Sequence, residues 1–271
     1  MAFAEAPIIA EGKTKIIRAI PDTADVYITS KDDITAGDGE KRDLLTNKGI
    51  LSTETTSNCF KLLNISGIPT HFIERVDNTT FRARNMEMIP IELVARRIAT
   101  GSYLKRNPEI LEGEIFNSLM LEFFIKDDLN HDPMVIYDFV GRRALFYQAS
   151  KPMKEGFMGE TFLSNLWERS AVVEDLTRMT SKVFEILEIA WEAQNVTLVD
   201  LKIECGWDRE TEELLVADVI DNDSWRIWPV GDKSHMRDKQ VYRNLEVVTL
   251  DALNAIRRNY EWVADATKRF I

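Results

Sequence analysis

The stretch from Thr197 to Trp228 constrains the fold more than any other part of the chain. Its first half alternates apolar and charged residues, the period of two that is typical of a strand with one buried face. Its second half, 215–220, is an apolar run interrupted by Asp218, and a carboxylate in such a run is costly to bury without a partner. The polar residues 206–213 between the two halves predict a hairpin that brings Glu204 close to Asp218.

The charged side chains of this hairpin have two interpretations. Glu204 and Asp218 would form a hard-oxygen site that suits Mg²⁺ and the phosphates that accompany it. Alternatively, Asp200, Lys202 and Glu204 would form the solvated outer face of a two-stranded ribbon, and on their own these three residues favour that interpretation. The acidic residues that follow Asp218, together with Arg226, favour a site instead.

Composition excludes several classes of protein. The 271 residues can bury a substantial core, as one large domain or two smaller ones. A net charge of −11 argues against general nucleic-acid binding, which needs a basic surface. The two cysteines, Cys59 and Cys205, indicate neither a disulfide framework nor a zinc site. We find no apolar run near the roughly 18 residues of a membrane span and no secretion signal, so we expect a cytoplasmic protein without membrane partners.

Near the N-terminus, residues 8–18 predict two strands joined by a tight turn at Gly12. Lys13 and Lys15 lie two residues apart, so on a strand their ammonium groups share a face and could meet phosphate oxygens. A plain hairpin explains the same residues. The Gly-Lys-Thr run does not complete a P-loop, because Pro7 stands where that motif requires a glycine.

The remaining pattern predicts an α+β chain. Several short strands and a helix over 51–63 suit a small N-terminal lobe. Amphipathic helices are predicted over 171–191 and 249–271. We expect residues 31–42 to form a loop and residues 134–168 to form an irregular insertion without assigned chemistry.

Two further groups of basic residues could bind phosphate or carboxylate, because an arginine fork binds both bidentately. The first brackets a Thr-Gly-Ser turn and could equally be a solvated basic face: Arg96, Arg97, Lys105 and Arg106. The second could form a local pocket with Arg226 in an otherwise acidic protein: Lys233, Arg237, Lys239 and Arg243.

Six segments in order resemble the SAICAR synthetase family, the phosphoribosylaminoimidazole-succinocarboxamide synthases of purine biosynthesis. They are EGKTK, DDITAGDG, EMIPIELVARRIATGSYLKRNP, TLVDLKIE, VADVIDNDSWRIWP and DKQVYR. These segments are most similar to the synthetase domain of the animal bifunctional enzyme. Only residues 134–170 lack a clear match to the family. One departure is Cys205, where the family usually has Phe, and we expect a change in packing there without the loss of a ligand.

The resemblance implies a fold and a reaction. The fold is α+β, two-lobed and ATP-grasp-like, with antiparallel sheets and flanking helices. Residues 1–90 would form the ATP-binding lobe, and residues 91–271 the lobe with the metal site and the nucleotide-substrate pocket. The enzyme would be an ATP-dependent ligase that uses Mg²⁺ and joins L-aspartate to carboxyaminoimidazole ribonucleotide. The products would be SAICAR, ADP and phosphate; a fused AIR carboxylase domain and a homo-oligomer both stay open.

The resemblance also implies roles for individual residues. The ATP phosphates would be covered by Gly12, Lys13 and Lys15, and the adenine edge by the backbone of Glu87 and Met88. Magnesium would be bound by Glu204 and Asp218, with Lys202 near the phosphates. The phosphate and carboxylate of the nucleotide substrate would be bound by Arg96, Ser102, Arg226 and Arg243. Near aspartate and the reacting centre would lie Asp38 and Lys239, which with Lys13 and Lys202 complete the expected catalytic set.

Two other functions compete with this interpretation. A small-molecule kinase would use the same ATP site with a hydroxyl acceptor, but the chain has no His-Arg-Asp catalytic-loop motif. A non-catalytic nucleotide-binding homologue should have lost Lys13, Glu204 or Asp218, and all three are present. ADP formation that depends on both aspartate and the imidazole carboxylate would separate the ligase from the kinase, and thermal shift with Mg-ATP is a simple test of nucleotide binding.

Overall fold

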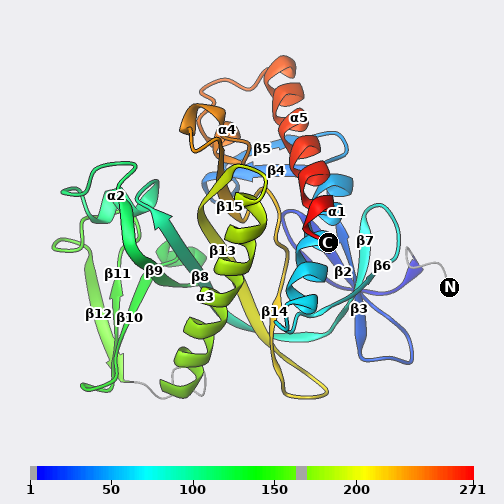
Figure 1. The fold of residues 1–271 in the computed structure, drawn as a ribbon. Helices are drawn as coiled ribbons and strands as arrows, with labels where there is room; N and C mark the ends of the chain where they lie inside the picture. The colour runs from blue at the N-terminus through cyan, green and yellow to red at the C-terminus, as the bar shows by residue number, and fades with distance from the viewer. Residues whose placement is uncertain (1–4, 163–169) are drawn as a thin grey trace.

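The computed structural model describes residues 5–162 and 170–271, which form two main antiparallel sheets with helices packed against them (Figure 1). This confirms the predicted α+β class with antiparallel sheets and flanking helices. The first sheet has the strand order β1-β2-β3-β7-β6. Its strands are β1 (Ile8–Glu11), β2 (Lys15–Ala19), β3 (Asp25–Ser30), β6 (Phe72–Arg75) and β7 (Thr80–Arg84). The predicted strand-turn-strand at the N-terminus is confirmed, with the Gly12 N–H donating to the Lys15 carbonyl at 2.9 Å.

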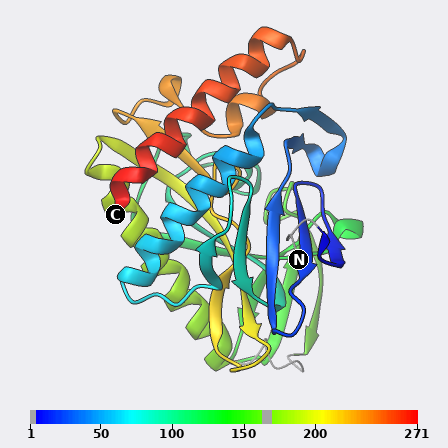
Figure 2. The same cartoon turned by 90° about the vertical axis from the view of Figure 1, so that its right-hand side faces the viewer.

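Helix α1 (Lys48–Ile65) packs against this sheet and lies beside α5 (Leu250–Thr267). Figure 2 shows the two helices running side by side, and the Asn58 side chain donates to the Thr267 hydroxyl at 3.2 Å. Both helices were predicted from their apolar spacing, and both are confirmed. The first and last quarters of the chain therefore meet in one layer.

Residues 31–42 were predicted to form a loop, and that prediction is wrong. They form most of a two-stranded sheet made of β4 (Asp33–Ala36) and β5 (Lys41–Leu44), joined by the 3-10 turn η2 (Gly37–Gly39). Gly37 and Gly39 both have positive φ, which lets so short a turn close. The sheet is anchored by Ile34, which is buried against aromatic residues of the C-terminal region.

The second sheet is eight-stranded, in the order β12-β11-β10-β9-β8-β13-β14, with β15 also paired to β13. Its strands are β8 (Met86–Ile98), β9 (Ile115–Ile125), β10 (Met134–Asp138), β11 (Arg143–Tyr147), β12 (Phe157–Phe162), β13 (Val196–Asp208), β14 (Leu214–Ala217) and β15 (Trp225–Pro229). The predicted hairpin across residues 206–213 is confirmed as β13 and β14.

One sequence prediction about this sheet is wrong. Residues 134–162 form the meander β10-β11-β12 instead of an irregular insertion, because each short strand pairs with its neighbour. The last part of that prediction, 163–168, lies outside the described residues. β8 continues through Pro90 without a break. The proline sits where the β8–β13 register shifts, so its missing N–H costs no ladder bond to β13.

Short helices complete the described chain: α2 (Ser102–Arg106), η3 (Asp128–Asn130), η5 (Lys233–His235), α4 (Gln240–Arg243) and η6 (Lys268–Phe270). The long helix α3 (Ser170–Glu192), predicted over 171–191, crosses one face of the large sheet (Figure 1). Its Leu187 and Trp191 are fully buried in a core that also takes in Leu201 of β13 and Phe60 of α1. Cys205 is buried in the same core, with its Sγ 3.7 Å from the sulfur of Met179, as a packing role requires.

The two sheets are joined by backbone hydrogen bonds at one place. Val216 of β14 donates to the Pro69 carbonyl at 3.1 Å and accepts from the His71 N–H at 2.9 Å. The first sheet ends at Arg84 and the second begins at Met86, yet one hydrophobic core spans both. The division into lobes at residue 90 therefore stays a prediction. No helix in the described ranges is long and apolar enough to cross a lipid bilayer.

We predict that Leu187→Ala lowers the free energy of unfolding by about 2–5 kcal/mol, because it leaves a cavity beneath the sheet. The matched control is Ile189→Ala on the same helix, whose side chain is 66% exposed. The control should stay within about 0.5 kcal/mol of the wild type in urea unfolding. Equal losses in the two variants would contradict the assigned face of α3.

Candidate active site

A cavity of about 860 Å³ is lined by residues of both sheets. The β1–β2 turn, the β4–η2 segment and the facing strands β8 and β13 contribute to it. The segment from β9 through residue 132, the residues after β14 and those around α4 also contribute to it. Segments distant in the sequence therefore present polar side chains to one cavity.

Strand β13 contributes both acidic and basic side chains to the lining of this cavity. Asp200, Lys202 and Glu204 all line it, as the period of two predicts, while Leu201 and Ile203 are buried in the main hydrophobic core. The alternative of a solvated outer face is wrong, because Asp200 is 4% exposed and Glu204 is 5% exposed. Carboxylates buried to this degree need charged or hydrogen-bonding partners.

The register of the hairpin brings Asp218 next to Glu204. Glu204 pairs with Ala217, the last residue of β14, so Asp218 follows immediately and lines the same cavity. The strand does not continue to residue 220 as predicted, because Asp218 has a φ of +62° and turns the chain. His71 stabilises this turn, with its ring Nε2 donating to the Asp218 carbonyl at 3.0 Å.

Lysines surround the two carboxylates. Lys126 lies 2.9 Å and Lys202 3.3 Å from Glu204, and Lys15 pairs with Asp218. Burial alone would raise the pKa of Glu204, but Lys202, Lys126 and Lys15 together lower it to about 2. Burial lowers the pKa of Lys15 to about 8, although Glu204 opposes that shift. The site is thus a compact, largely ionised cluster.

A second charged cluster is centred on Arg96, which was predicted to bind substrate. Its Nε is 2.5 Å from Glu122 and its Nη1 is 2.7 Å from Asp200. Arg226 shares Asp200 at 2.5 Å, and Arg106 binds the other Glu122 oxygen. Because Arg96 lines the cavity with its charge already paired, it is placed to brace Arg226 as well as to face a ligand.

Gly101 is required where the Arg226 guanidinium meets the backbone. It has a φ of +61°, and a Cβ there would lie 2.5 Å from Nη2 of Arg226. Ser102 follows it and lies 3.4 Å from Nη2 of Arg96. The glycine therefore permits a close approach that any side chain would block.

The cavity brings together most of the residues that the sequence singled out: Gly12, Lys13, Lys15, Arg96, Ser102, Lys202, Glu204, Asp218, Arg226, Lys239 and Arg243. Glu87 and Met88 lie further along β8, opposite Trp207 and Gly206, and are not part of this lining. The side chain of Asp38 lies outside the described part of the structure. The roles of these three residues stay predictions.

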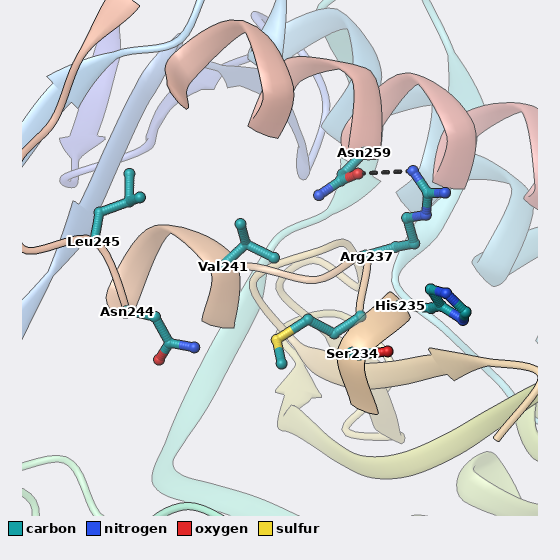
Figure 3. A pocket seen from close by; sticks show the side chains of 8 residues that line it. Ser234, His235, Arg237, Val241, Asn244, Leu245 and Asn259 are labelled. Carbon is teal, nitrogen blue, oxygen red and sulfur yellow. Dashed lines mark hydrogen bonds between the residues drawn. The ribbon is translucent and has the colours of Figure 1, made fainter. Parts of the chain in front are cut away.

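Two basic residues of the predicted C-terminal pocket face elsewhere. Lys233 pairs with Glu112 at 2.7 Å, and Arg237 donates to Asn259 at 3.0 Å. Arg237 helps to line a separate cavity of about 500 Å³ beside α5, which Figure 3 shows in close view. Apart from Arg237, none of the residues singled out from the sequence is among the described residues that line this second cavity.

Sequence reasoning missed several residues of the site, above all Lys126. It follows β9 directly, and its side chain reaches Glu204 because β9 and β13 flank the same strand, β8. The Lys-Asp-Asp run could have marked it, but only once the order of the strands was known. Glu92, which binds Lys202 at 2.7 Å, was likewise quoted only as part of a motif.

Glu204 and Asp218 could hold a divalent cation. Within residues 5–162 and 170–271, no three His, Cys, Asp or Glu side chains gather at metal-binding distances. A cation here would therefore have two protein carboxylates and would complete its shell with ligand oxygens. That donor set fits Mg²⁺, which is commonly held by one or two carboxylates and substrate phosphates.

Fold and site together define an α+β enzyme that handles phosphate groups, with lysines and arginines around a pair of carboxylates. A family model described as SAICAR synthetase matches residues 8–258. The chain belongs to the SAICAR synthetase family, and it is a ligase of purine biosynthesis.

The relatives include both free-standing and fused proteins. A phosphoribosylaminoimidazole-succinocarboxamide synthase of Roseiflexus castenholzii is 45% identical over 264 residues, which cover 97% of each chain. The multifunctional protein ADE2 of Gallus gallus is 46% identical over 258 residues, 95% of this chain but only 57% of that protein. The similarity to animal proteins is therefore matched by that to bacterial ones.

Solved structures agree with the fold. A phosphoribosylaminoimidazole-succinocarboxamide synthase from Ehrlichia chaffeensis superposes with a TM-score of 0.80 at 30% identity, covering 97% of this chain and 98% of that one. A SAICAR synthetase described as a complex with ADP has a TM-score of 0.74 at 28% identity, covering 93% and 96%.

We predict that Gly101→Ala lowers kcat/KM for SAICAR formation by at least about tenfold, because the new methyl displaces Arg226 from the cavity. Gly113→Ala is the matched control: its φ is +90°, and no atom lies within 4 Å of the added Cβ. The control should lose some stability but keep kcat/KM within about twofold. Equal losses of activity would show that backbone strain, and not Arg226, is responsible.

Proposed function

We propose that the chain joins L-aspartate to the carboxylate of carboxyaminoimidazole ribonucleotide, with ATP converted to ADP and phosphate. Family membership and the composition of the cavity support this reaction. One observation carries the assignment of the site. The β13–β14 register places Glu204 and Asp218 in one cavity with three lysines.

The chemistry explains why such a site is needed. A carboxylate is a poor electrophile for an amine. Transfer of the γ-phosphoryl group of ATP to the substrate carboxylate gives an acyl phosphate. The aspartate amine then forms the amide, loses a proton and expels phosphate. Catalysis of phosphoryl transfer rests on positioning and on cations placed around the transferring group.

The nucleotide end of the site is the cluster around Glu204. Gly12 permits close approach of the backbone, and Lys13, Lys15 and Lys202 would face the phosphates. Mg²⁺ bound by Glu204 and Asp218 would neutralise phosphate charge. The lysines that pair with these carboxylates here are then available to phosphate oxygens. The ADP complex of a family member supports nucleotide binding by this chain.

The substrate end is the cluster around Asp200. Arg226, Ser102 and Arg243 would bind the phosphate and carboxylate of the ribonucleotide, because planar guanidinium groups match both. Arg96 would keep Arg226 in place through their shared carboxylate as well as contact the substrate. Lys239 and Asp38 would act near the aspartate and the reacting centre.

Other parts of the proposal extend beyond the cavity. The backbone of Glu87 and Met88 would hold the adenine edge, with residues 1–90 as the ATP-binding lobe and residues 91–271 as the substrate lobe. A fused carboxylase, as the name of the Rattus norvegicus relative describes, and a homo-oligomer are both compatible with the chain. A cytoplasmic location stays a prediction.

A coupled assay for ADP, with each substrate omitted in turn, tests the reaction. We expect ADP to form when ATP, aspartate and the imidazole ribonucleotide are all present. If water slowly hydrolyses the acyl phosphate, a small aspartate-independent rate of ADP formation remains. ADP formation with a hydroxyl acceptor in place of the ribonucleotide would indicate a kinase. Absence of ADP under every condition would indicate a binding protein.

We predict that Asp218→Asn lowers turnover by at least about a hundredfold, because it removes charge from the proposed metal site. The matched control is Asp208→Asn at the far end of β13, where the carboxylate binds Arg84 at 2.7 Å outside the cavity. Both variants should unfold as cooperatively as the wild type in calorimetry. Near-normal turnover in Asp218→Asn would refute the assignment.

A further inference from the structure

Asp223 is the centre of a buried cluster that joins Lys239 to Lys48 and Tyr260. Its Oδ2 lies 3.0 Å from Lys239 Nζ and 3.4 Å from Lys48 Nζ. Its Oδ1 accepts from the Tyr260 hydroxyl at 2.6 Å. Both carboxylate oxygens are therefore held, and the carboxylate cannot rotate without breaking one of these contacts.

Lys48 is in an unfavourable place for a lysine unless it serves a partner. It is the first residue of α1, where the helix dipole disfavours a cation, and its side chain is 2% exposed. Its ammonium also lies 5.8 Å from the centre of the Tyr260 ring. Burial alone would raise the pKa of Asp223, but Lys48 and Lys239 hold it well below its usual value.

Lys239 connects this cluster to the cavity. It lines the cavity together with Asp223, whereas Lys48 and Tyr260 lie behind them and are not part of the lining. Arg243 and Asp221 line the same region. Two cations beside two carboxylates complement the charges of an amino acid, which carries both an ammonium and carboxylate groups.

We propose that Lys48 and Tyr260 are positioning residues that fix Asp223, so that Lys239 is aimed into the cavity to bind a carboxylate of the amino-acid substrate. This inference rests on the proposed function. Neither residue touches the substrate. Each acts through Asp223, and Lys239 makes the contact.

The test is steady-state kinetics with each substrate varied in turn. In Lys48→Met, the KM for L-aspartate should rise by about tenfold, while the KM values for ATP and the ribonucleotide stay within about twofold. Tyr260→Phe keeps the ring and removes only the hydroxyl, so it should shift the same constant in the same direction by a smaller factor. The control is Arg178→Met, which breaks an ion pair to Asp175 at 2.5 Å on α3, outside the cavity, and should leave all three constants unchanged.

A double variant distinguishes positioning from general loss of structure. The double variant Lys48→Met/Lys239→Met should bind aspartate no worse than Lys239→Met alone, because Lys48 affects aspartate binding only through Lys239. Additive losses, or a parallel rise of all three KM values, would overturn the proposal. If Lys48→Met does not fold, unchanged constants in Tyr260→Phe overturn it. A wild-type enzyme that makes no SAICAR would instead refute the proposed function.

Discussion

The position of β14 between two partners is the constraint on which the rest of the site depends. On one side it pairs with β13 in a register that sets Ala217 opposite Glu204. On the other, Val216 exchanges backbone hydrogen bonds with residues 69–71, which lead into β6 of the first sheet. Asp218 follows this doubly held strand and turns at a positive φ, a conformation that persists only where the surroundings enforce it.

In the other two charged clusters, buried carboxylates fix the positions of basic side chains. Asp200 holds Arg96 and Arg226, which both line the cavity, and Asp223 holds Lys239, which lines it, and Lys48, which lies behind. Such pairs contribute little net stability, because desolvation offsets their attraction. Their value here is geometric, since a cation fixed before the ligand arrives needs no reorganisation during the reaction.

Local patterns in the sequence predicted the hairpin and the three long helices, because alternation and three-to-four spacing are properties of a single segment. Long-range pairing was not accessible in this way. The β4–β5 sheet was missed because its anchor, Ile34, packs against residues about two hundred positions later. Lys126 and Lys48 were missed because nothing local marks them as neighbours of Glu204 and Asp223. Arg96 was predicted to bind substrate, but its ion pairs with Glu122 and Asp200 could not be predicted without the order of the strands.

The most direct test of this account is a crystal structure of the chain with Mg²⁺ and a non-hydrolysable ATP analogue. The account predicts one ion at about 2.0–2.1 Å from an oxygen of Glu204, an oxygen of Asp218 and a phosphate oxygen. Lys15 should then have left Asp218 for a phosphate. Phosphates bound elsewhere, with both carboxylates still paired to their lysines, would contradict it.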